Sequence, residues 1–96
     1  MTVKVKVPTI LRKYVGGRAL VEANGGRTVG EVLDDLEQRF PGIKERIVTG
    51  GGELHRFVNV YVNEEDVRYL GSLEAEVREG DTVSILPAVA GGSEPA

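Results

Sequence analysis

The sequence predicts an α+β fold in which a mixed sheet of about five strands grips one helix. Three segments indicate this fold. Residues 3–7 alternate between valine and lysine, residues 28–40 carry apolar side chains at helical spacing, and residues 56–62 are rich in β-branched and aromatic residues. At 96 residues, the chain is long enough for one small hydrophobic core. We expect residues 1–86 to form that domain and residues 87–96 to be a flexible tail.

The first two strands are expected to form a hairpin. In residues 3–7 the valines point to one side and Lys4 and Lys6 to the other, which is typical of a strand with one buried face. Residues 8–17 contain a proline and a pair of glycines, and they predict a loop. Strand character resumes at residues 18–24, which predict the second strand.

Residues 28–40 predict a helix with both ends marked. Thr28 with Glu31 three positions later is a capping box, and Pro41 and Gly42 end the helix after its last apolar residue. One apolar stripe runs along this helix and is expected to pack on the sheet: Val29, Val32, Leu33, Leu36 and Phe40.

The second half of the chain predicts a helical turn at residues 42–48 and three further strands. The strands are expected at residues 56–62, 67–69 and 82–86. A crossover helix is what allows two strands to lie parallel in one sheet. The first and last strands are therefore expected to lie parallel at the centre, which is the β-grasp arrangement.

Composition excludes several classes of function. Without cysteine, the chain has no disulfide, no cysteine-ligated zinc and no cysteine nucleophile, and His55 is its one histidine. A net charge of −3 argues against a nucleic-acid partner. No apolar stretch approaches the roughly 18 residues of a membrane span, and the start lacks a secretory signal. We therefore expect a cytoplasmic protein with neither a membrane partner nor a metal site.

The chain continues past its last predicted strand into "AVAGGSEPA". Gly91 and Gly92 lack side chains, so together with Ala90 they would let the backbone thread a slot too narrow for larger residues. Residues 87–92 can extend about 20 Å at about 3.3 Å per residue. A carboxylate at Gly92 could therefore reach the active site of a partner enzyme. The alternative interpretation of the glycine pair is a linker remnant.

The β-grasp order together with "AGG" resembles the ThiS and MoaD family of sulfur carriers, whose fold is ubiquitin-like. Within that family, the chain resembles the CysO-type carriers of actinobacterial cysteine biosynthesis. The blocks that carry this resemblance are "VPTILRKYVGG", "LHRFVNVYVNEEDVRYL" and "GDTVSILPAVAGG". They cover both ends and the middle of the chain, and the helix region matches loosely.

The resemblance implies a protein cosubstrate with no catalytic residue and no bound cofactor of its own. An E1-like enzyme would use ATP to adenylate Gly92, and sulfur transfer would then produce a thiocarboxylate. The sulfur would pass to an aminoacrylate formed from O-phosphoserine on a pyridoxal-phosphate (PLP) dependent synthase similar to CysM. A JAMM-type zinc metallopeptidase would finally cut the cysteinyl adduct from the carrier.

The resemblance also implies that partners dock on hydrophobic residues of the sheet near the tail. Pro8 and Leu86 lie at matching positions. We add Phe57, which alternates with Val58, and Val89 in the tail.

Ser93 is a departure from the family, whose active carriers end at the second glycine. With Ser93 attached, the carbonyl of Gly92 is an amide and not a carboxylate. We expect a precursor that is processed between Gly92 and Ser93 by the same JAMM-type peptidase, with loss of residues 93–96. The alternative is that these four residues do not belong to the natural chain.

Two other functions remain open at this point. The chain could carry sulfur for molybdopterin, thiamine or secondary-metabolite biosynthesis, which the neighbouring gene for the acceptor enzyme would reveal. It could also be a ubiquitin-like modifier whose Gly92 forms isopeptide bonds with lysines of other proteins, which would produce conjugates of high mass.

Overall fold

The computed structural model describes residues 2–24, 27–56 and 58–87. Its strands are β1 (Thr2–Lys6), β2 (Leu20–Asn24), β3 (Val58–Val62), β4 (Glu65–Asp66) and β5 (Thr82–Pro87). Helix α1 (Val29–Arg39) lies between β2 and β3. Short 3-10 helices join the other elements: η1 (Thr9–Val15), η2 (Lys44–Arg46), η3 (Val67–Tyr69) and η4 (Ser72–Glu74). No helix in this described part of the chain is long and apolar enough to cross a bilayer.

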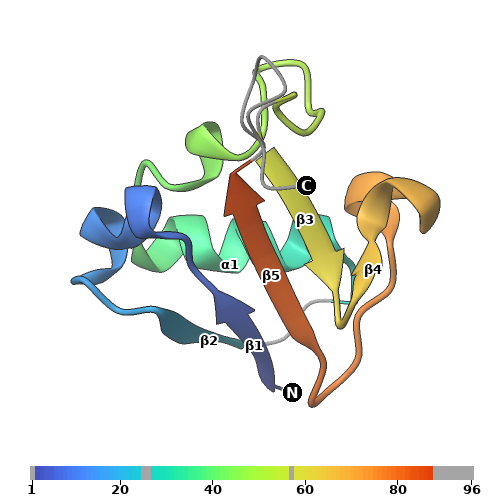
Figure 1. Cartoon of the computed structure of the whole chain (residues 1–96), viewed down its shortest axis with the longest axis horizontal. Coiled ribbons are helices and arrows are strands. Elements are labelled where there is room, and N and C mark those ends of the chain that lie inside the picture. The colour runs from blue at the N-terminus through green and yellow to red at the C-terminus, as the bar shows by residue number, and fades with distance from the viewer. Residues whose placement is uncertain (1, 25–26, 57, 88–96) are drawn as a thin grey trace.

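The strands form one mixed sheet in the order β2-β1-β5-β3-β4. β1 and β5 are parallel neighbours, with Val5 opposite Val83, and the other pairs are antiparallel. Helix α1 lies across one face of this sheet (Figure 1). The predicted β-grasp with its central parallel pair is confirmed. The parallel pairing is possible because the chain crosses the sheet through α1 before it returns as β5.

The hydrophobic core lies between the sheet and α1. The alternation predicted for β1 is confirmed, since Val3 and Val5 are fully buried and Lys4 and Lys6 are exposed. β3 alternates in the same way, with its valines buried. Helix α1 buries the predicted stripe against these strands, and the members of the stripe are Val29, Val32, Leu33, Leu36 and, at its edge, Phe40. Removing this apolar surface from water is the main driving force of the fold.

The start of α1 follows the predicted capping signal. Thr28 is the N-cap, and its hydroxyl oxygen accepts a hydrogen bond of 3.2 Å from the Glu31 amide. The Glu31 carboxylate accepts a bond of 2.7 Å from the Arg27 amide, one residue before the N-cap. Both bonds engage amides at the helix entrance, where the helix itself supplies no acceptor. The helix ends at Arg39, and Phe40 is its C-cap.

Residues 9–15 form the helical segment η1 where the sequence analysis predicted a loop, so that prediction is wrong. Leu11 and Val15, four positions apart, are both buried in the core, and this packing stabilises a helical turn. Gly16 ends η1 with a φ of 71°, a left-handed conformation that glycine adopts without strain. The second strand then begins at Leu20, two residues later than predicted.

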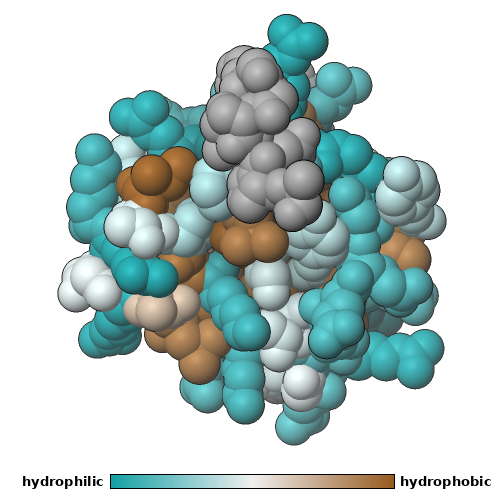
Figure 2. All heavy atoms as spheres, in the orientation of Figure 1, coloured by the Kyte–Doolittle hydropathy of each residue, from teal (hydrophilic) through white to brown (hydrophobic). Residues whose placement is uncertain are grey.

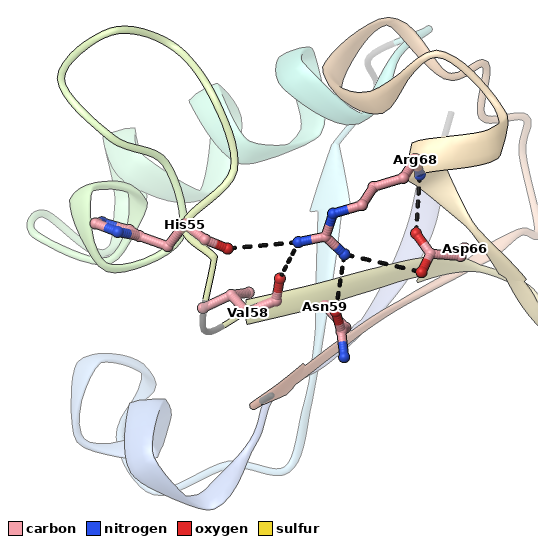
Figure 3. A network of polar contacts seen from close by, with 5 residues as sticks. All are labelled: His55, Val58, Asn59, Asp66 and Arg68. Carbon is pink, nitrogen blue, oxygen red and sulfur yellow. Dashed lines mark hydrogen bonds and ion pairs between the residues drawn. The ribbon is translucent and has the colours of Figure 1, made fainter. Parts of the chain in front are cut away.

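The prediction of a strand at residues 67–69 is also wrong. Strand β4 ends at Asp66, and residues 67–69 form the 3-10 helix η3. The Asp66 carboxylate accepts a bond of 2.8 Å from the Arg68 amide. The Arg68 guanidinium then donates to the Asn59 side chain and to the Val58 carbonyl, each at 2.8 Å (Figure 3). This network fixes η3 against β3 and overrides the strand propensity of the segment.

Candidate functional site

An apolar groove opens beside the end of β5. It forms where the ends of β1 and β5 meet η1 and the start of β2, and its volume is about 520 Å³. Hydrophobic atoms gather in this part of the surface (Figure 2). We call it the β5 groove, and it is lined by Lys6, Val7, Pro8, Thr9, Ile10, Arg12, Ala19, Leu20, Ile85, Leu86 and Pro87.

Three large apolar side chains of the β5 groove are exposed to solvent. Ile10 is 62% exposed, Leu20 is 48% exposed and Leu86 is 47% exposed. Single exposed hydrophobic residues are common on protein surfaces, whereas a cluster of them is typical of an interaction site. The groove therefore has the character of a surface that binds another protein.

Strand alternation places these side chains on the surface. On β5, Ile85 points into the core, so Leu86 points to the open side. On β2, Val21 points into the core and Leu20 points out. Ile10 joins them from η1, in which Leu11 and Val15 are buried. The groove is thus built from three segments that lie far apart in the sequence.

The β5 groove lies where the predicted tail begins. Pro87 lines the groove and is the last residue of β5, where it lies opposite Val58. Pro87 was expected to begin the tail, but β5 extends one residue further than predicted and includes it. Gly92 follows five positions after Pro87 (92 minus 87). Five residues at about 3.3 Å each can extend about 17 Å from the groove.

The structure brings two of the predicted docking residues together. Pro8 lies in the floor of the β5 groove, where it is buried, and Leu86 lies on the exposed rim. The other predicted site residues lie outside the described residues, and these are Phe57, Val89, Ala90, Gly91, Gly92 and Ser93.

Of the residues that line the groove, sequence reasoning assigned only Pro8 and Leu86 to docking. Among those that it missed are the two exposed apolar residues Ile10 and Leu20 and the two basic residues Lys6 and Arg12. Leu20 could have been found, because it alternates with the buried Val21 and so had to point away from the core. Ile10 and Arg12 belong to η1. Because that segment was predicted to be a loop, it had no periodicity from which the orientation of these side chains could be derived.

The groups with shifted pKa values do not line the β5 groove. The backbone amides of Gly42 and Lys44 donate to the Glu37 carboxylate, each at 2.9 Å, and lower its pKa. A hydrogen bond to Tyr14 raises the pKa of Arg46. The bonds of Glu37 and of Arg46 fix the chain that follows α1.

Across the described residues, no cluster of three or more His, Cys, Asp or Glu side chains could hold a metal ion.

Residues 5–92 match the model of the ThiS family. The chain belongs to the ThiS family. Among its relatives is the sulfur carrier protein CysO of Mycobacterium tuberculosis, which is 53% identical over 94 residues. That alignment covers 96% of this chain and 100% of CysO.

Solved structures agree with this ThiS family membership. The crystal structure of M. tuberculosis CysO matches with a TM-score of 0.87 at 52% identity, covering 91% of this chain and 99% of that chain. A chain of the Amycolatopsis orientalis BexX/CysO complex matches with a TM-score of 0.86 at 61% identity, covering 94% of this chain and 99% of that one. These relatives support a sulfur-carrier role, and one of them forms a complex with a partner protein.

Proposed function

We propose that this ThiS family protein is a cytoplasmic sulfur carrier for cysteine biosynthesis. Its reacting atom is the carbonyl carbon of Gly92, and partner enzymes hold the folded domain. The proposal depends on one structural observation, that β5 ends at Pro87 in an exposed apolar groove. In the sequence, a pair of glycines follows four and five positions later. The family match, which ends at Gly92, supports the same assignment.

A carboxylate at Gly92 must be activated before it can accept sulfur. In the proposed reaction, an E1-like enzyme transfers AMP from ATP to the Gly92 carboxylate, and pyrophosphate leaves. The sulfur of a sulfide donor then attacks the carbonyl carbon and displaces AMP, which leaves a thiocarboxylate. A persulfide donor would instead leave an acyl disulfide, and a thiol would have to cleave it to release the thiocarboxylate, with a second disulfide as the by-product. Glycine suits this position because no Cβ shields the carbonyl carbon. Ala90 and Gly91 are also small, so the backbone before Gly92 can pass through a narrow slot of the partner enzyme.

The acceptor in this proposal is an aminoacrylate bound to a CysM-like, PLP-dependent synthase. It forms from O-phosphoserine by loss of phosphate, and the nucleophilic thiocarboxylate sulfur adds to it. The product is a thioester, and transfer of the Gly92 acyl group from sulfur to the cysteine amine would convert it to a peptide bond. A JAMM-type zinc peptidase then hydrolyses that bond with water, which releases cysteine and regenerates the Gly92 carboxylate. ATP and PLP belong to the partner enzymes, and the carrier supplies only the sulfur.

The β5 groove is the proposed docking surface for these partners. Pro8 shapes its floor and Leu86 its rim, and we propose that Phe57 and Val89 contribute to the same contact. A shuttle must leave each partner after transfer, so the docking area is expected to be small and the affinity modest.

We further propose that the chain is made as a precursor. Ser93 blocks adenylation, because an amide carbonyl cannot attack ATP as a carboxylate does. Cleavage between Gly92 and Ser93 by the JAMM-type peptidase removes residues 93–96 and frees the reactive end.

Mass spectrometry tests the carrier and the precursor proposals together. The chain ending at Gly92 and the full chain are each incubated with the E1-like enzyme of the same organism, ATP and a sulfide source. We expect the shortened chain to gain the mass difference of one oxygen-to-sulfur exchange and the untreated full chain to show no gain. The full chain should show the same gain once the peptidase has been added. Gly92→Ala in the shortened chain is the matched control and should react far more slowly. A shortened chain that never forms a thiocarboxylate would falsify the carrier role.

A further inference from the structure

The β5 groove is positively charged in a protein whose net charge is −3. Lys6 and Arg12 line it, and its lining residues include no aspartate or glutamate. The exposed apolar side chains of Ile10, Leu20 and Leu86 share the same groove. The groove therefore combines apolar contact surface with two cations.

Arg12 is positioned before any partner binds. Its Nε donates to the Val7 carbonyl at 3.2 Å, and η1 holds its backbone because the neighbouring Leu11 is buried. Within the described residues, neither the terminal guanidinium nitrogens of Arg12 nor the Lys6 ammonium has a hydrogen bond or an ion pair. Among the residues that the structure describes, these two positively charged donor groups thus have no partner at the apolar surface.

Lys6 lies on the same side of the sheet as this apolar surface. In the strand register it stands opposite Leu20 on β2 and opposite Ser84 on β5. Its side chain is exposed, as is that of Leu20. A ligand that covers Leu20 therefore brings its own charges close to the Lys6 ammonium.

We infer that the β5 groove binds an acidic segment of the activating enzyme, an inference that rests on the proposed function. An apolar side chain of that segment covers Ile10, Leu20 and Leu86, and an adjacent Asp or Glu pairs with Arg12, assisted by Lys6. The planar guanidinium matches a carboxylate in two parallel hydrogen bonds, which fixes the register of docking. Arg12 is thus a positioning residue that fixes how the folded domain sits on the enzyme.

Charge reversal tests the inference. The dissociation constant of the full chain and the E1-like enzyme of the same organism is measured by calorimetry, and adenylation is followed with the chain ending at Gly92. We expect Arg12→Glu to raise the dissociation constant and KM at least about tenfold while kcat is unchanged. Arg12→Lys should recover part of the loss, and added salt should weaken the wild-type complex more than the complex of Arg12→Gln.

Arg78→Glu is the matched control, because it changes the net charge by the same amount at an arginine that does not line the β5 groove and is 84% exposed. We expect it to bind normally. Lys6→Glu is the second groove variant, and it breaks no side-chain hydrogen bond within the described residues. Thermal unfolding of each variant separates weaker docking from a damaged fold.

A photo-crosslinking side chain at position 10 identifies the bound segment. The inference expects a peptide of the enzyme with an Asp or Glu beside the crosslink, and expects that reversing this acid to Lys restores binding of Arg12→Glu. Equal effects of Arg12→Glu and Arg78→Glu, a crosslinked peptide without an acid, or a crosslink to a second copy of the carrier would each overturn it. If the chain ending at Gly92, with no other change, is never adenylated, the proposed function fails instead.

Discussion

Asn59 lies directly opposite Leu86 in the antiparallel pair of β3 and β5. The Asn59 side chain also accepts a hydrogen bond from Arg68, whose guanidinium binds the Val58 carbonyl as well. Because Val58 pairs with Pro87, the network that fixes η3 also braces the strand beside the end of β5. The rim of the β5 groove is therefore supported by residues far from it in the sequence.

Replacement of Leu86 by alanine should weaken docking and leave the fold intact. Leu86 is 47% exposed, so we expect the free energy of unfolding to change by less than about 1 kcal/mol. KM for adenylation should rise about tenfold, because the exposed side chain provides apolar contact in the proposed interface. Tyr69→Ala is the control, since Tyr69 is 88% exposed and does not line the groove. An unchanged KM for Leu86→Ala would argue against docking at this site.

Replacement of Arg68 by alanine should loosen η3. The variant loses the bonds to the Asn59 side chain and the Val58 carbonyl, and because Arg68 is partly exposed we expect a cost of about 1 kcal/mol. Hydrogen exchange should speed up at the Leu70 amide, which donates to the Val67 carbonyl. Arg78→Ala removes a similar charge at an open position and should leave this amide unchanged.

Replacement of Thr28 by alanine should destabilise α1. The hydroxyl that accepts the Glu31 amide bond is lost, and such changes at an N-cap cost about 0.5–2 kcal/mol. Thr28→Ser keeps the hydroxyl and should retain most of the stability. Urea unfolding of the three proteins measures the difference, and equal midpoints for the Ala and Ser variants would show that the cap contributes nothing.

Glu37 should contribute to stability in a pH-dependent way. The amides of Gly42 and Lys44 bind its carboxylate and lower its pKa in the folded chain from the ordinary value of 4.5. A lowered folded pKa stabilises the fold above the unfolded pKa, and this contribution is lost as the pH falls through the folded value. Glu37→Gln should therefore be less stable than wild type at pH 7, and the gap should close in acid.

Thermal unfolding across this pH range tests the role of Glu37. Glu64→Gln is the matched control, because Glu64 is exposed and has no hydrogen bond within the described residues. Its stability should follow that of wild type at every pH. A gap between Glu37→Gln and wild type that stays constant in acid would show that the ionised carboxylate is not the cause.

Local patterns predicted most of the fold correctly. The valine alternation of β1, the helical stripe of α1 and the Thr28 cap are each determined by residues within a few positions of one another. The errors at η1 and η3 have a common cause. In both segments, a contact with another part of the chain decided the conformation, through burial of Leu11 in one and the bonds of Arg68 in the other.

The sequence by itself determined the β-grasp order of elements, the Gly91-Gly92 pair and the resemblance to sulfur carriers, because each of these is a property of neighbouring residues along the chain. Only the tertiary structure decided that Ile10, Leu20 and Leu86 share one groove, that Arg12 and Lys6 line it, and that Pro87 ends beside it. Those relationships depend on the strand order, which brings the ends of β1 and β5 beside the start of β2. No local pattern contains that information, because the pairing of distant strands is set by the packing of the whole core.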